Sequence, residues 1–147
     1  MTMHRRPVTR TRLLAAIGAL LMLGGCFLPW WTRGGAAGQL TTLSGTAFEG
    51  LGIVVFAAAI ATLALVTLPY ATERPVALDR WTSYAVIAVA GWLAFGYRIV
   101  ELGSVKAFSF AEPAEFITNI PGLWLSGIGL IVLARATYEM LGEPRLR

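Results

Sequence analysis

The chain has few of the residues on which most enzymes depend. Its 147 residues include one cysteine, Cys26, one histidine, His4, and one lysine, Lys106. A lone cysteine excludes an intramolecular disulfide, and the sequence contains neither an HExxH nor a GxSxG pattern. The sequence therefore disfavours a hydrolase or a metalloenzyme, and it predicts no catalytic residue, no metal ligand and no cofactor.

Charged residues are also scarce, at 14% of the chain, and they leave long gaps. The four longest uncharged stretches contain 20, 23, 17 and 19 residues, at positions 13–32, 50–72, 81–97 and 116–134. A helix needs about 20 residues to cross a bilayer core about 30 Å thick. Since a soluble protein of this size would not hide four helices that are apolar all round, the stretches predict transmembrane helices.

We therefore predict an all-α fold, a polytopic membrane protein formed by an antiparallel bundle of four transmembrane helices in one domain, residues 1–147. The helices are expected at 13–31, 47–69, 81–102 and 120–141, with 41–45 as a flexible entry to the second. The segment 103–119 is expected to be a loop on the outer interface, with Pro113 in the first turn of a short helix.

The basic residues predict the orientation. The N-terminal tail, the 71–80 loop and the C-terminal tail carry nine Arg residues, against three basic residues in the segments between them. By the positive-inside rule both termini and the 71–80 loop face the cytoplasm. Because 11 of the 12 basic residues are Arg and Ala is abundant, the composition favours a high-GC bacterial source, and the expected location is a bacterial inner membrane. The pI near 9.8 does not indicate nucleic-acid binding, because the basic residues lie at chain ends and in loops.

Aromatic residues near the expected helix ends are predicted to be interfacial anchors, since their amphipathic rings suit the level of the lipid headgroups. These anchors are Trp30, Trp31, Tyr70, Trp81, Tyr97, Trp124 and Tyr138.

Three ionisable residues are predicted to meet at the outer side of the second and third helices. Glu49 lies at the outer opening of the second helix, and Arg98 and Glu101 lie three apart near the end of the third, on one face. Arg98 is expected to bridge the two carboxylates and connect the helices. The alternative is that the three residues form a shallow site for a ligand or an ion.

Cys26 supports two interpretations. The basic N-terminus, the apolar stretch and the sequence Leu23, Gly24, Gly25, Cys26 resemble a lipoprotein signal peptide, in which Cys26 is lipidated after cleavage. However, the apolar run continues through Trp31, whereas a lipoprotein usually follows its cysteine with a polar tether. We prefer the interpretation in which the first helix is not cleaved, and the processed lipoprotein is the alternative.

Small residues recur at four-residue spacing in pairs such as Ala15 and Ala19, and Ala90 and Ala94. In lipid such residues let helix backbones approach closely. They predict packing within the bundle or, alternatively, an interface for a partner protein.

The first half of the chain resembles small uncharacterised four-helix membrane proteins of high-GC bacteria. The resemblance is carried by Gly18 to Leu21, by Phe27, Leu28, Pro29 and Trp30 at the end of the first helix, and by Ser44, Gly45 and Gly50 at the opening of the second. It implies this topology and an uncleaved first helix, and it supplies no activity.

The expected function is that of an accessory or scaffold subunit of a membrane assembly, with the lipid bilayer and a membrane-protein partner or a second copy of the chain as its partners. The alternative is a protein that binds or transports a small molecule or lipid in an outer-leaflet crevice beneath residues 103–119, with the three ionisable residues at its mouth.

Overall fold

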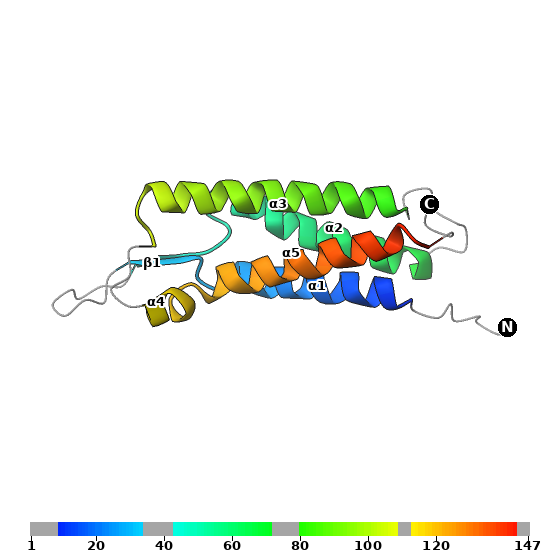
Figure 1. The fold of residues 1–147 in the computed structure, drawn as a ribbon, viewed down its shortest axis with the longest axis horizontal. Helices are drawn as coiled ribbons and strands as arrows, with labels where there is room; N and C mark the ends of the chain where they lie inside the picture. The colour runs from blue at the N-terminus through cyan, green and yellow to red at the C-terminus, as the bar shows by residue number, and fades with distance from the viewer. Residues whose placement is uncertain (1–8, 34–42, 72–79, 109–112, 144–147) are drawn as a thin grey trace.

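The computed structural model describes residues 9–33, 43–71, 80–108 and 113–143, and over these ranges the chain is mostly helical. Four long helices lie side by side along the long axis of the molecule (Figure 1). They are α1 (Arg10–Phe27), α2 (Gly52–Ala71), α3 (Trp81–Ser104) and α5 (Pro121–Met140). The short elements are β1 (Trp31–Arg33), β2 (Leu43–Gly45) and α4 (Pro113–Thr118).

Three of the long helices, α1, α2 and α3, are long and apolar enough to cross a membrane. The helix α5 has the 20-residue length of α2, but Arg135 and Glu139 lie near its C-terminal end. Arg135 Nε donates a hydrogen bond to Glu139 Oε1 at 2.9 Å, the (i, i+4) pair that the sequence spacing favours.

The two ends of the bundle differ. The strands, α4 and the end of α3 lie at one end, which we call the hairpin end (Figure 1). The start of α1 and the end of α5 lie at the other, the terminal end. Beyond the long helices, β1 and β2 pair antiparallel, with Trp31 opposite Gly45, and the hydroxyl of Thr32 donates to the carbonyl of Asn119 at 2.7 Å. The hairpin is thereby tied to the start of α5.

The first helix ends at Phe27, so the predicted end at Trp31 is wrong. Leu28 is extended, with φ −88° and ψ 159°, as expected for a residue before proline, and Pro29 cannot donate a helical hydrogen bond. The chain therefore leaves α1 there and continues into β1.

The second helix begins at Gly52, so the predicted start at residue 47 is also wrong. Residues 43–45, expected to be a flexible entry, form β2. Gly50 has a φ of 73°, a left-handed conformation that interrupts any helix and suits glycine. The helix then continues two residues past its predicted end at Pro69, because a proline in the last turn removes only one late hydrogen bond.

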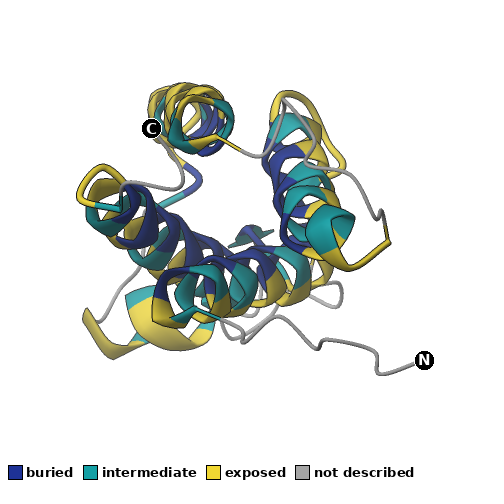
Figure 2. Ribbon diagram, turned by 90° about the vertical axis from the view of Figure 1, so that its right-hand side faces the viewer, coloured by how far each residue is buried: buried dark blue, intermediate teal, exposed yellow. Residues whose placement is uncertain are grey.

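Buried residues lie on the inner faces of the four helices and exposed residues on the outer faces (Figure 2). The core includes Met22 from α1, Val55 from α2, Tyr84 from α3 and Leu130 from α5. Most of the exposed side chains on the outer faces of the helices are large and apolar. Such an exterior is compatible with lipid as the surrounding medium.

The closest helix contact lies between α1 and α5, which are the first and last helices of the chain. A Cβ added at Gly18 would come within 2.8 Å of the carbonyl oxygen of Gly129, and one at Gly129 within 2.7 Å of the carbonyl oxygen of Gly18. Nearer the hairpin end, Gly25 meets the backbone of Gly122 and Ser126. We call this contact the glycine seam. Ala15 and Ala19 of α1 are also fully buried, so their face packs within the bundle.

Candidate functional site

The ionisable residues predicted at the outer side lie at the hairpin end. Arg98 Nη1 of α3 donates to Glu101 Oε2 at 2.6 Å, one turn along the same helix. The side chain of Arg98 is 8% exposed and that of Glu101 is 41% exposed. Within the described part of the chain the buried Nε of Arg98 has no hydrogen-bond partner. The arginine is thus a buried cation held by one partly exposed carboxylate.

The start of α2 packs against this ion pair. A Cβ at Gly50 would lie 3.0 Å from Arg98 Nη1 and 3.6 Å from Glu101 Oε2, so the chain passes directly against the ion pair here, and the φ of 73° favours glycine at this position. Arg98 therefore connects α3 to the entry of α2. Sequence analysis placed Gly50 at the opening of the second helix, but it gave no indication of this contact, which depends on the tertiary fold.

Glu49 makes a different interaction from the predicted one. Its Oε2 accepts a hydrogen bond from Trp31 Nε1 at 3.0 Å, and the described residues show no ion pair between Glu49 and Arg98. Gly45, opposite Trp31 in the hairpin, has no room for a Cβ because the indole and the carboxylate occupy that position. The expected bridge across two carboxylates is therefore replaced by one ion pair and one separate hydrogen bond.

Trp30 is not an interfacial anchor, because it is fully buried. Its Nε1 donates to the carbonyl of Gly25 at 3.0 Å, and its ring meets Phe95 edge to face at 5.6 Å. The physical reason is the early end of α1. After Pro29 the chain turns, which brings the Trp30 ring under the hairpin, while its backbone N–H donates to the carbonyl of Gly45.

The other predicted anchors lie at or near the surface. Trp31 and Trp81 are partly buried, whereas four are exposed, namely Tyr70, Tyr97, Trp124 and Tyr138. The indole of Trp124 donates to the carbonyl of Phe116 in α4 at 3.2 Å, and the rings of Phe108 and Phe116 meet edge to face. An amphipathic ring at a helix end is suited to the headgroup region, and Trp124 additionally holds α4 against α5.

Cys26 is fully buried near the end of α1, next to the glycine seam. Cleavage before this residue would remove nearly all of α1, including Gly18, Met22 and Gly25, which pack on α5. Lipidation would also require the thiol to reach the lipid. The packing therefore supports the uncleaved first helix.

A pocket lined by described residues lies at the terminal end, away from Glu49, Arg98 and Glu101. It has a volume of about 560 Å³ and lies between the last turns of α2 and the first turns of α3. Among the described residues no group of three His, Cys, Asp or Glu side chains is placed to hold a metal ion. Comparisons with protein-family models, with curated proteins and with solved structures give no match.

Proposed function

We propose that this chain is an accessory or scaffold subunit of an assembly in a bacterial inner membrane, with α1, α2, α3 and α5 as four antiparallel transmembrane helices. Three of them meet the length and hydropathy needed to cross a bilayer. The fourth, α5, packs along α1 through the glycine seam, so it follows α1 across the same layer. Its two charged residues lie near its C-terminal end, where side chains reach the headgroups.

The proposed orientation of the bundle in the membrane depends on the end of the bundle at which the arginines lie. Arg10 and Arg12 lie at the start of α1, and Arg80 precedes α3, all at the terminal end. The positive-inside rule places that end in the cytoplasm and the hairpin end on the outer side.

The observation that supports an accessory role is a stripe of apolar side chains along α3. Val89, Leu93 and Val100 are between 58% and 72% exposed, and their spacing of four and seven residues puts them on one face. The opposite face of α3 contacts α2 and α5. Since lipid supplies no hydrophobic drive between helices, such a face binds a partner helix through close packing. The partner is a membrane protein or a second copy of the chain.

Association is the first test of this proposal. Purification in native nanodiscs followed by mass measurement should give an assembly heavier than one 15.8 kDa chain. Leu93→Trp should reduce the assembled fraction, because an indole on the stripe prevents close packing. Ile131→Trp, at a 57% exposed position of α5, is the matched control and should leave the assembly intact. A single-chain mass in several lipid compositions would contradict the proposal.

Topology is the second test. Green fluorescent protein fused to the C-terminus should fluoresce, and alkaline phosphatase fused there should be inactive, because the terminal end faces the cytoplasm. Phosphatase inserted between β1 and β2 should be active. Opposite results at the two sites, or reporters that place the N- and C-termini in different compartments, would overturn the four-span topology.

The alternative of an outer-leaflet crevice is not supported by a specific contact. Its expected polar mouth consists of Arg98 and Glu101 paired with each other and Glu49 bound to Trp31. These interactions stabilise the entry of α2 rather than leaving charges directed at a ligand.

A further inference from the structure

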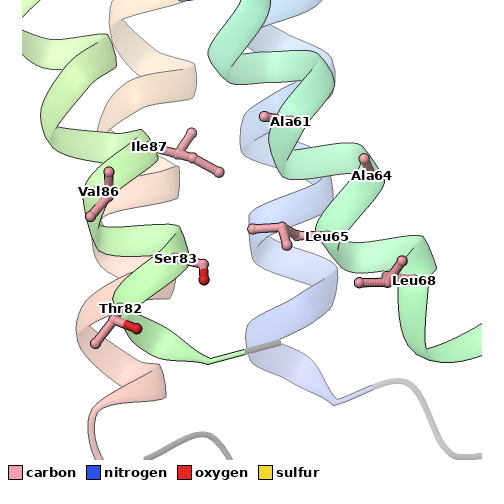
Figure 3. Close-up of a pocket in the computed structure, with 8 residues that line it drawn as sticks. All are labelled: Ala61, Ala64, Leu65, Leu68, Thr82, Ser83, Val86 and Ile87. Atoms are coloured by element: carbon pink, nitrogen blue, oxygen red, sulfur yellow. The ribbon is translucent and has the colours of Figure 1, made fainter. Parts of the chain in front are cut away.

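The pocket between α2 and α3 has an apolar wall and a polar end (Figure 3). Ala61, Ala64 and Leu68 contribute to the α2 side and Ile87 to the α3 side, while the hydroxyl-bearing Thr82 and Ser83 lie at the end formed by the first turn of α3. The two alanines stop at Cβ, which leaves space between helices whose other side chains are large. The volume of about 560 Å³ lies within the range of roughly 300–1,000 Å³ typical of small-molecule sites.

The length of the pocket fits part of a lipid chain. Residues 61 to 68 of α2 cover about 10 Å at 1.5 Å per residue, which is roughly a third of a bilayer core. The apolar part therefore matches about two thirds of one acyl chain, the part closest to its headgroup. In a transmembrane bundle this depth is in contact with hydrocarbon, so a lipid reaches the pocket directly from the membrane.

The polar end is complementary to an anion. Within the described residues no side chain caps the first turn of α3, so the positive end of its dipole lies uncapped at this end of the pocket. Thr82 and Ser83 add two hydroxyl donors, and Arg80, exposed and immediately before the helix, adds a positive charge. Basic pockets between transmembrane helices on the cytoplasmic side are a recurrent way of holding anionic headgroups.

From these features we infer that the pocket binds an anionic phospholipid of the cytoplasmic leaflet. One acyl chain lies between Ala64 and Ile87, and the phosphate accepts hydrogen bonds from Thr82 and Ser83 beside Arg80. The inference relies on the proposed membrane orientation, but not on the proposed accessory role.

Lipid retention tests the site. The full-length protein, released from mixed phosphatidylglycerol and phosphatidylcholine nanodiscs with identical acyl chains, should retain phosphatidylglycerol preferentially in native mass spectrometry. Ala64→Phe should lower retention about tenfold by filling the pocket, equivalent to about 1.4 kcal/mol. Ala57→Phe, on the exposed surface of the same helix and outside the pocket, is the matched control and should retain lipid as the parent chain does.

A second variant tests the headgroup without altering the packing. Arg80→Gln should reduce the preference for phosphatidylglycerol over phosphatidylcholine about fivefold, since a basic residue near the surface contributes about 1 kcal/mol to anionic-lipid binding. Equal retention of the two lipids by the parent chain, or unchanged retention in Ala64→Phe, would overturn the site.

The two proposals fail separately. A single-chain protein that retains phosphatidylglycerol contradicts the accessory role alone. An assembled protein without lipid preference contradicts the lipid site alone. If Ala64→Phe dissociates an assembly and leaves lipid retention unchanged, the pocket holds a partner helix and the lipid site is wrong.

Discussion

Gly129→Ala is expected to lower the free energy of unfolding by about 1–3 kcal/mol, the usual cost of overpacking a core. The added Cβ would lie 2.7 Å from the backbone nitrogen of Met22 and from the carbonyl oxygen of Gly18. Backbone atoms of a packed helix cannot rotate away as a flexible side chain does, so α1 and α5 must separate along the seam. Unfolding in mixed detergent and dodecyl sulfate, followed by circular dichroism, measures the loss.

Gly96→Ala is the matched control for this substitution. Gly96 is also a helical glycine, in α3, but a Cβ there meets nothing within 4 Å. The change should be neutral or stabilise the helix by up to about 1 kcal/mol, because alanine has the higher helix propensity. Equal stability changes at the two positions would show that the seam does not hold α1 to α5.

The double variant Gly18→Ala/Gly129→Ala separates a shared contact from two independent effects. Each substitution pushes apart the same pair of backbone segments. Once the first has separated the helices, the second should cost less than it does alone, so the two free-energy changes should not add.

The sequence predicted the long helices because their signal is local. An uncharged run of about 20 residues requires no knowledge of the rest of the chain, and α3 begins at Trp81, the position expected from the end of the charged loop. The interaction of Arg98 with Glu101 could also be predicted from the local sequence, since a spacing of three places both side chains on one face of a helix.

The hairpin was missed because each strand has three residues, too few for a period-two pattern to appear. That omission had further consequences. Without the hairpin, the sequence suggests that Trp30 and Trp31 are equivalent residues of an aromatic belt. In the structure Trp30 is fully buried and Trp31 donates a hydrogen bond to Glu49. The missing link between Glu49 and Arg98 has the same origin, because the hairpin supplies the competing donor.

The glycine seam could be anticipated only in part. Small residues at four-residue spacing indicated close helix packing, and Ala15 and Ala19 do lie inside the bundle. However, the closest approach involves Gly18 of α1 and Gly129 of α5, which are 111 positions apart in the sequence. Which small residues meet depends on which helices are neighbours, and hydropathy does not contain that information.

Removing Glu101 from the ion pair at the hairpin end should lower the free energy of unfolding more than removing Arg98. Glu101→Gln leaves the guanidinium of Arg98, which is 8% exposed, without its carboxylate. The guanidinium of Arg98 also lies beside the N-terminal end of α2, where the positive end of the helix dipole repels it. Removing one member of a fully buried pair costs about 3–5 kcal/mol, and because Glu101 is 41% exposed, we expect about 2 kcal/mol.

Arg98→Met should cost less than Glu101→Gln, although it deletes the larger and more buried side chain. The methionine replaces most of the apolar stem of the arginine, and the carboxylate left behind at position 101 is partly exposed to solvent. The double variant Arg98→Met/Glu101→Gln should recover most of the stability lost in Glu101→Gln, because it contains no buried charge. Arg135→Gln breaks the other described ion pair at a 66% exposed site and should change stability by less than about 1 kcal/mol. If Arg98→Met is the more damaging single substitution, the guanidinium contributes through packing on Gly50 and not as a buried charge that requires its carboxylate.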